Sequence, residues 1–339
     1  MAFDNTVDVL TLEDIVPVVV DQVLRTNRFI TTALSKTKRF RAATQDFPIK
    51  YQTGTPIQSF IGMQSLPTAF TDTRVLMKFN PTFVAANIAL AGTDILANNV
   101  AQKVLDLVEV EMVSRAQDLA DGLGTMAYGL GNGQDILGLQ ALVDNGTNVA
   151  TIGGLNRNTY TTLQSILINN SILSLSGLRT LYNDIVDAGV VPTRIYTDFP
   201  TWALYESLLQ PQEKIFKEIN IVPNYKGYSG FDGLMFAGLE IVPDRKCTSG
   251  YLYMLNEDYL NFWALDSSLE EFDGSRQVRV ASKLFEGNQY NEVGSLGFYW
   301  TGFIKTTQQF AYNSFLVLAG NLLTQNPRRH GVQTGITSV

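Results

Sequence analysis

Residues 96–124 read LANNVAQKVLDLVEVEMVSRAQDLADGLG, and this stretch decides the fold class because it is the strongest helical pattern in the chain. Apolar side chains recur every three or four residues, at Leu96, Val100, Val104, Leu107, Val108, Met112, Ala116, Leu119 and Leu123. We predict one long helix over 92–123, ended by Gly122 and Gly124. Roughly 30 residues span about 45 Å, a length typical of a structural spine.

The segment before this helix, residues 42–91, predicts a long two-stranded excursion with an irregular tip. Two strand-like stretches, Phe47–Gln52 and Arg74–Phe79, are separated by residues rich in proline and glycine. The excursion has too few apolar residues to fold alone, and an isolated two-stranded ribbon is only marginally stable. We therefore expect it to lie on another surface.

The N-terminal region, residues 11–40, predicts an interrupted helix that Thr11 can cap and Pro17 strains. Six basic residues and no acid lie at its end: Arg25, Arg28, Lys36, Lys38, Arg39 and Arg41. Such a run is either a solvated helix face or a basic arm that contacts a polyanion or the acidic face of a neighbour.

Beyond the long helix, residues 129–160 are rich in glycine and asparagine and predict a loop region with short fragments. A helix over Leu178–Val186 ended by Gly189, a buried strand at Arg194–Thr197 and a helix opening at Pro200 follow. Further strands are expected at Gly238–Val242, Gly250–Leu255, Tyr259–Ala264, Gln277–Ala281, Phe298–Thr301 and Phe315–Leu318. Asn256–Asp258 predicts a hairpin turn, and the tail from Asn321 is expected to be loose.

The composition bounds the class of protein. The 339 residues include 25 Lys+Arg against 32 Asp+Glu, a formal charge of −7, with 45% hydrophobic residues. This length predicts one to three domains with a sizeable core and excludes a wholly disordered chain. The acidic balance argues against nucleic-acid binding over the whole surface, although one local basic patch remains compatible with it.

Cysteine and histidine each occur once, as Cys247 and His330. A disulfide framework within the chain and a zinc site of Cys/His type are therefore excluded. His330 lies in a polar segment and predicts a solvated tail residue, while Cys247 predicts a small buried filler. The N-terminus resembles no signal peptide and no apolar run reaches a membrane span. We therefore expect a protein kept in a cytoplasm-like compartment, or one that leaves it without the secretory route.

Enzyme motifs are absent or in the wrong context. Gly122-x-Gly124-x-x-Ala127 ends a helix instead of joining a strand to a helix, as dinucleotide binding requires. Gly129-x-Gly131-x-Gly133 lacks the Lys-Ser/Thr of a phosphate loop. Glu270, Glu271 and Asp273 could supply a carboxylate pair, but consecutive acids beside Gly274 favour a solvated turn. We predict no catalytic residue, no cofactor and no metal site, which favours a structural role.

The order of these parts resembles the major capsid proteins of tailed bacteriophages, the Hong Kong 97-type fold. Local sequence carries the likeness: Gly138–Gly146 after the long helix, the helix ending Asp187-Ala-Gly189, and Asp198-Phe-Pro200-Thr-Trp202 after a strand. Gly238–Pro243 followed by Gly250–Leu255 is similar to the next strand pair of that family.

The resemblance implies an α+β subunit built from consecutive parts. These are an N-terminal arm (1–45), an extended loop over the adjacent subunit (46–91), a peripheral domain with the spine helix (92–164), an axial domain (165–266), returning peripheral strands (267–312), and a C-terminal strand and tail (313–339). It implies hexamers and pentamers that close an icosahedral virion around double-stranded DNA, assembled in the bacterial cytoplasm.

The implied partners are other copies of the chain, scaffolding, portal and decoration proteins, and packaged DNA contacted non-specifically. The six basic residues of the arm would face DNA or hold subunits together, and Lys50, Arg74 and Lys78 would make the contacts of the extended loop. Two alternatives stay open: an encapsulin-type nanocompartment shell of the same fold, and a hydrolase that uses carboxylates such as Glu270 and Asp273.

Overall fold

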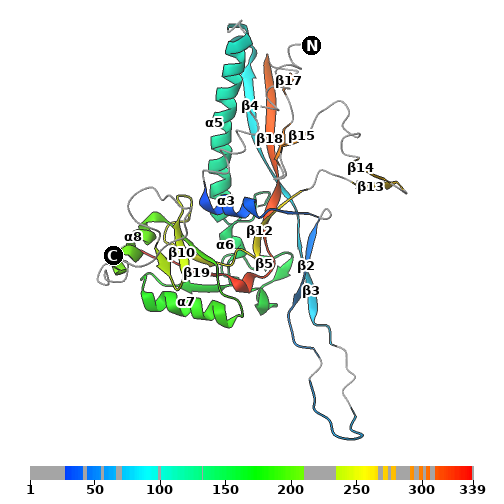
Figure 1. Cartoon of the computed structure of the whole chain (residues 1–339), viewed down its shortest axis with the longest axis vertical. Helices are drawn as coiled ribbons and strands as arrows, with labels where there is room; N and C mark the ends of the chain where they lie inside the picture. The colour runs from blue at the N-terminus through cyan, green and yellow to red at the C-terminus, as the bar shows by residue number, and fades with distance from the viewer. Residues whose placement is uncertain are drawn as a thin grey trace.

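The computed structural model describes residues 27–40, 44–54, 57–65, 71–97, 101–131, 133–209, 234–265, 270–273, 276–279, 291–293, 298–300, 303–305 and 310–337. It is a mixed α+β chain in which a long helix beside extended strands stands above a compact sheet-and-helix unit (Figure 1). A two-stranded ribbon points away from the long helix, toward the opposite end of the molecule (Figure 1).

The longest strand, β18 (Ala311–Thr324), organises a seven-stranded sheet of the described strands. β4 (Thr82–Ala91) runs antiparallel to it over ten residue pairs, from Ala311↔Ala91 to Gly320↔Thr82. β12 (Leu260–Ala264) pairs with the last part of β18, and β1 (Lys38–Arg39) extends β12 in parallel. β15 (Asn291–Val293), β16 (Phe298–Trp300) and β17 (Ile304–Lys305) complete this long sheet.

The long helix exists as predicted, but its predicted end is wrong. α4 (Gly92–Ala97) precedes α5 (Ala101–Tyr128), and α5 lies along β4 and β18 (Figure 1). Gly122 and Gly124 are inside α5 and do not end it. α5 buries Val108 and Met112 against the long sheet, so tertiary packing overrides the weak helix propensity of glycine. α5 and the long sheet together are the long-sheet lobe.

The second unit, the compact lobe, is a six-stranded sheet in the order β7-β19-β11-β8-β10-β9. The strands are β7 (Ile166–Asn169), β8 (Arg194–Thr197), β9 (Met235–Phe236), β10 (Leu239–Pro243), β11 (Leu252–Leu255) and β19 (Gly331–Thr334). Its helices α7 (Leu175–Asp187) and α8 (Phe199–Leu209) confirm the predicted helix–strand–helix unit. Gly189 adopts φ +109°, as expected where it closes α7.

Two predictions about the C-terminal half are wrong. Asn256–Asp258 does not turn a hairpin, because β11 lies in the compact sheet and β12 in the long sheet. The residues after Asn321 are not loose: they complete β18 and then form β19 between β7 and β11. Both segments therefore carry the chain from one lobe to the other.

Short elements connect these units. α3 (Arg28–Ser35) is the described part of the predicted N-terminal helix, and the prediction for residues 11–26 lies outside the described residues. α6 (Leu139–Leu142), β5 (Thr151–Ile152) and β6 (Leu155–Asn156) occupy the predicted loop region. Two 3-10 turns lie outside it, at Thr161–Leu163 before β7 and at Pro327–Arg329 between β18 and β19. The acids Glu270–Asp273 form strand β13, paired with β14 (Arg276–Arg279), so the expectation that they form a turn is wrong.

Candidate assembly surfaces

The protruding ribbon has two chemically different faces. β2 (Gln45–Lys50) and β3 (Arg74–Phe79) pair antiparallel, close to the two predicted strands. On the inner face, Met77 is fully buried, and the Phe47 ring lies 5.5 Å from the Trp263 ring of the long sheet. The Lys78 N–H donates to the Gly153 carbonyl (3.0 Å), which fixes the root of the ribbon to its own chain.

The outer face of the ribbon is exposed and predominantly basic. Lys50 stands directly opposite Arg74 across the two strands, and Lys78 stands opposite Asp46. These are the three loop residues singled out from the sequence, and the register brings all of them to one face. Like charges opposite each other destabilise a ribbon in isolation, so this face is suited to an acidic partner surface.

The tip of the ribbon carries four large apolar side chains that are mostly or fully exposed. Ile57 and Met63 are fully exposed, Ile61 is 87% exposed and Phe60 is 58% exposed. A cluster of large apolar side chains on a protruding segment marks a surface that another molecule covers. The sequence indicated the excursion but not this apolar tip, because the tip has neither strand nor helix periodicity.

A second apolar surface lies on the long sheet, on the face that α5 leaves open. Alternate residues of β4 point there, including Phe83, which is 61% exposed. Phe315 of β18 is 39% exposed and stands opposite Asn87. The alternation explains both faces, since residues such as Ile88 and Leu90 between the exposed ones are buried toward α5.

The basic residues of the predicted arm are spread along α3 and β1. Arg28 is exposed, while the ammonium of Lys36 lies 3.2 Å from Glu257 Oε2 and that of Lys38 lies 5.7 Å from the centre of the Trp263 ring. Arg39, in β1, stands opposite Ala264 of β12. Arg25 and Arg41 lie outside the described residues. The described members thus follow the surface of their own chain and do not converge on one point.

The single histidine and the single cysteine of the sequence are both buried. His330 is not a solvated tail residue: it is fully buried, and burial lowers its pKa to about 3. Its Nδ1 accepts from the Asn256 N–H (3.2 Å), so Nε2 carries the proton and donates to Thr324 Oγ1 (3.0 Å). Cys247 is buried as predicted, and burial raises the pKa of its thiol, which keeps it protonated.

The described residues contain no group of three or more His, Cys, Asp or Glu side chains placed to hold a metal ion. Among the same residues, no helix has the length and apolar character needed to cross a membrane.

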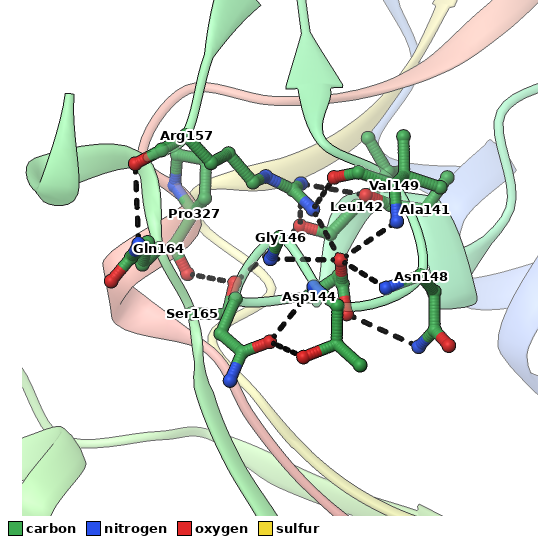
Figure 2. A network of polar contacts seen from close by, with 12 residues as sticks. Ala141, Leu142, Asp144, Gly146, Asn148, Val149, Arg157, Gln164, Ser165 and Pro327 are labelled. Carbon is green, nitrogen blue, oxygen red and sulfur yellow. Dashed lines mark hydrogen bonds and ion pairs between the residues drawn. The ribbon is translucent and has the colours of Figure 1, made fainter. Parts of the chain in front are cut away.

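A buried polar network, missed by sequence reasoning, holds the loops that follow α5 in the sequence; Figure 2 shows its contacts. Asp144 and Arg157 are both fully buried and form an ion pair at 3.2 Å. Asp144 Oδ2 also accepts from the backbone N–H groups of Gly146, Asn148 and Val149. Its signal in the sequence was Asp144-Asn-Gly146, which is typical of a loop closed by an aspartate side chain.

The guanidinium of Arg157 completes this network. Arg157 Nη2 donates to the carbonyls of Ala141 (2.6 Å) and Leu142 (3.3 Å), and Nη1 donates to that of Val149 (3.2 Å). Beside it, Ser165 Oγ donates to the Pro327 carbonyl (2.7 Å), which connects these loops to the crossing between β18 and β19 (Figure 2). The network therefore rigidifies the region where the two lobes meet.

Comparison with solved structures identifies the class of fold. The chain superposes on a subunit of the cyanophage A-1(L) capsid with a TM-score of 0.65 and 14% identity, covering 91% of this chain and 93% of that one. It also superposes on the SrpI encapsulin of Synechococcus elongatus (TM-score 0.52, 11% identity, 91% and 87% covered). A chain of Mycobacterium phage Bobi matches with a TM-score of 0.50, 10% identity and 91% coverage of both chains.

The fold is therefore that of phage major capsid proteins, and the same fold occurs in an encapsulin shell. No protein-family model matches the sequence. No curated protein matches it either. The resemblance stated from the order of sequence elements is thus confirmed at the level of fold.

Proposed function

We propose that this chain is the structural subunit of an icosahedral viral head, forming hexamers and pentamers that enclose double-stranded DNA. The observation that carries the proposal is a fold shared with a cyanophage capsid protein over nine-tenths of both chains, together with a protruding ribbon whose tip is apolar and exposed. Copies of one chain that contact each other through unlike surfaces form rings where the rotation closes.

In this proposal the parts keep the roles that the resemblance implied, but with other bounds. β4, expected in the extended loop, and β12, expected in the axial domain, belong to the long sheet, and β19, expected in the C-terminal tail, belongs to the compact sheet. α5 and the long sheet form the peripheral domain, the compact lobe forms the axial domain near the centre of each ring, and the ribbon lies over a neighbouring copy. Its basic outer face, with Lys50, Arg74 and Lys78, would contact an acidic surface of that neighbour. The tip would be covered by apolar surface, for which the open face of the long sheet is a candidate.

DNA, scaffolding, portal and decoration proteins complete the proposed set of partners. Arg28, Lys36, Lys38 and Arg39 are proposed to contact DNA non-specifically or to strengthen subunit contacts, with Arg25 and Arg41 before and after them. The Lys36 side chain is 46% exposed, so a polyanion can still reach its ammonium group. Substituting the four described residues by glutamine and finding unchanged DNA retention in heads would remove the DNA role.

An encapsulin-type shell is the second candidate, favoured by the superposition on the SrpI encapsulin. The two candidates differ in contents, since a viral head holds packaged DNA and a nanocompartment holds protein. Nuclease-protected DNA in particles from infected cells supports the head. Particles that contain a co-purifying enzyme and no DNA support the nanocompartment.

The assembly state of the full-length chain tests the shell function directly. Light scattering and negative-stain electron microscopy should show hexamers, pentamers, tubes or closed shells. Ile61→Ser at the ribbon tip should reduce assembly, whereas Ile172→Ser, at an exposed apolar residue of the compact lobe (60% exposed), should not. A stable monomer that never assembles, even with scaffold or crowding agents, would refute the proposal. It would favour the alternative of a hydrolase that uses carboxylates such as Glu270 and Asp273.

A further inference from the structure

α3 sits at the seam where α5 meets the compact lobe, and its first turn contacts both. The Phe29 ring lies 5.5 Å from the ring of Tyr128 in α5 and 5.2 Å from that of Tyr196 in β8. The Phe29 backbone N–H donates to Asp244 Oδ2 (3.2 Å), just after β10. One residue of α3 therefore bridges two lobes that are otherwise built from different sheets.

Asn27, the residue before α3, fits into a notch in α5. Asn27 is only 3% exposed, and its Nδ2 donates to the Ala120 carbonyl (2.8 Å). A Cβ atom at Gly124 would stand 2.4 Å from that nitrogen, so only glycine leaves room for it. Glycine in a helix interior costs about 0.5–1 kcal/mol relative to alanine. The space that the Asn27 side chain occupies explains why residue 124 is nevertheless a glycine.

The helix itself has little stability of its own. α3 has eight residues, far fewer than the roughly 12–15 that an isolated helix needs. The Asn27 side chain makes no capping hydrogen bond to α3, since it is directed to α5 instead. An apolar cavity of about 20 Å³ lies beneath the helix, lined by residues that include Ile30, Leu34 and Phe262. Side chains that face a void lose contact energy on that side.

The chain after α3 is held separately. The Phe40 N–H donates to the Ala264 carbonyl (2.9 Å), and β1 pairs with the edge of β12. The Lys36–Glu257 ion pair, with Lys36 46% exposed, adds only a weak contact. α3 can therefore leave the seam while its C-terminal end stays attached to the long sheet.

We propose that Asn27–Ser35 form a clasp that closes the seam between the lobes and releases as one unit while both lobes stay folded. Release uncovers the space between Tyr128 and Tyr196 and so loosens the contact between α5 and the compact lobe. Local openings of this kind require less free energy than global unfolding. The clasp operates within a single chain, whether or not copies assemble into a shell.

Two glycines of the same helix provide a matched test. Gly124→Ala places a methyl group against Asn27, whereas Gly122→Ala meets nothing within 4 Å. Both substitutions favour helix in α5. By hydrogen-exchange mass spectrometry of the full-length chain, Gly124→Ala should accelerate exchange in residues 29–35 at least about tenfold and leave α5 protected, and Gly122→Ala should change neither.

A disulfide provides the opposite perturbation. A Cβ at Gly124 would lie 2.8 Å from Asn27 Cγ, the position that the sulfur of a cysteine at residue 27 would take. Cysteines at both positions are therefore close enough to test for a disulfide. In a Cys247→Ser background, oxidised N27C/G124C should slow exchange in α3, and reduction should restore it. Exchange of α3 as slow as that of α5 in the unmodified chain would overturn the proposal. So would a Gly124→Ala chain that unfolds globally or exchanges faster everywhere.

Discussion

Replacing Arg157 with methionine removes a buried cation while leaving an unbranched side chain in its place. Asp144 would keep its three backbone N–H donors but lose its counter-charge, and three carbonyls (Ala141, Leu142 and Val149) would lose a guanidinium donor. Breaking a buried pair from one side typically costs about 3–5 kcal/mol, and both partners here are fully buried. We expect Arg157→Met to lower the free energy of unfolding by about 4 kcal/mol.

Urea unfolding of the full-length chain, followed by tryptophan fluorescence and circular dichroism, measures this loss. Arg115→Met is the matched control, because Arg115 pairs with Asp118 on the exposed side of α5 (46% and 64% exposed) and should cost less than about 1 kcal/mol. Asp144→Asn combined with Arg157→Met should cost less than the sum of the two single substitutions. A loss below about 1 kcal/mol for Arg157→Met, or strict additivity in the double variant, would refute this account of the network.

Three further outcomes concern His330, Gly153 and Cys247. The pKa of His330 is about 3 in the folded chain and about 6.5 in the unfolded chain, so protons bind preferentially to the unfolded chain. The free energy of unfolding should therefore fall by up to ~5 kcal/mol as the pH drops from about 6.5 toward 3. In urea titrations, the His330→Gln variant should lose less of this free energy between pH 7 and pH 4. Gly153→Ala, at φ +54°, adds a Cβ that would clash with Met77 Cγ and should make the ribbon root sensitive to protease. Gly154→Ala, at φ +79°, shares the backbone strain but meets nothing within 4 Å, so it should affect the root much less. Because burial raises its thiol pKa, Cys247 should react with a thiol reagent only after denaturation, and rapid reaction in the native chain would contradict its burial.

Local elements could be predicted from the sequence where one face of an element is buried. The long helix, α7, β8 and the two ribbon strands follow their hydrophobic periods and their capping or turn residues. The predicted pairing of β11 with β12 was wrong for a physical reason. Turn residues indicate where the chain reverses, but they do not determine which strand becomes the partner. Both strands are buried along their whole length, so both faces of each are covered, and burial does not show which sheet a strand joins.

The surfaces were predictable in part. The positions of Lys50, Arg74 and Lys78 on one face follow from the period of a strand, once the register is known. The burial of His330 could not be predicted, because its surroundings come from Asn256 and Thr324, brought together by two crossings between the lobes. The Asp144–Arg157 pair was missed because a polar residue in a glycine-rich segment predicts solvent exposure unless its partner is known.

β18 and β19 give this chain a particular order of completion during synthesis. β18 joins β4, β12, β16 and β17, and β19 lies between β7 and β11, so both sheets depend on residues 311–334. Until the ribosome has made those residues, β4 and β7 lack partners that are more than a hundred positions away. Neither lobe can close on a nascent chain that stops short of them, and such pairings across long separations are slow to form. Partly made chains therefore lack the finished sheets on which contacts between copies would depend.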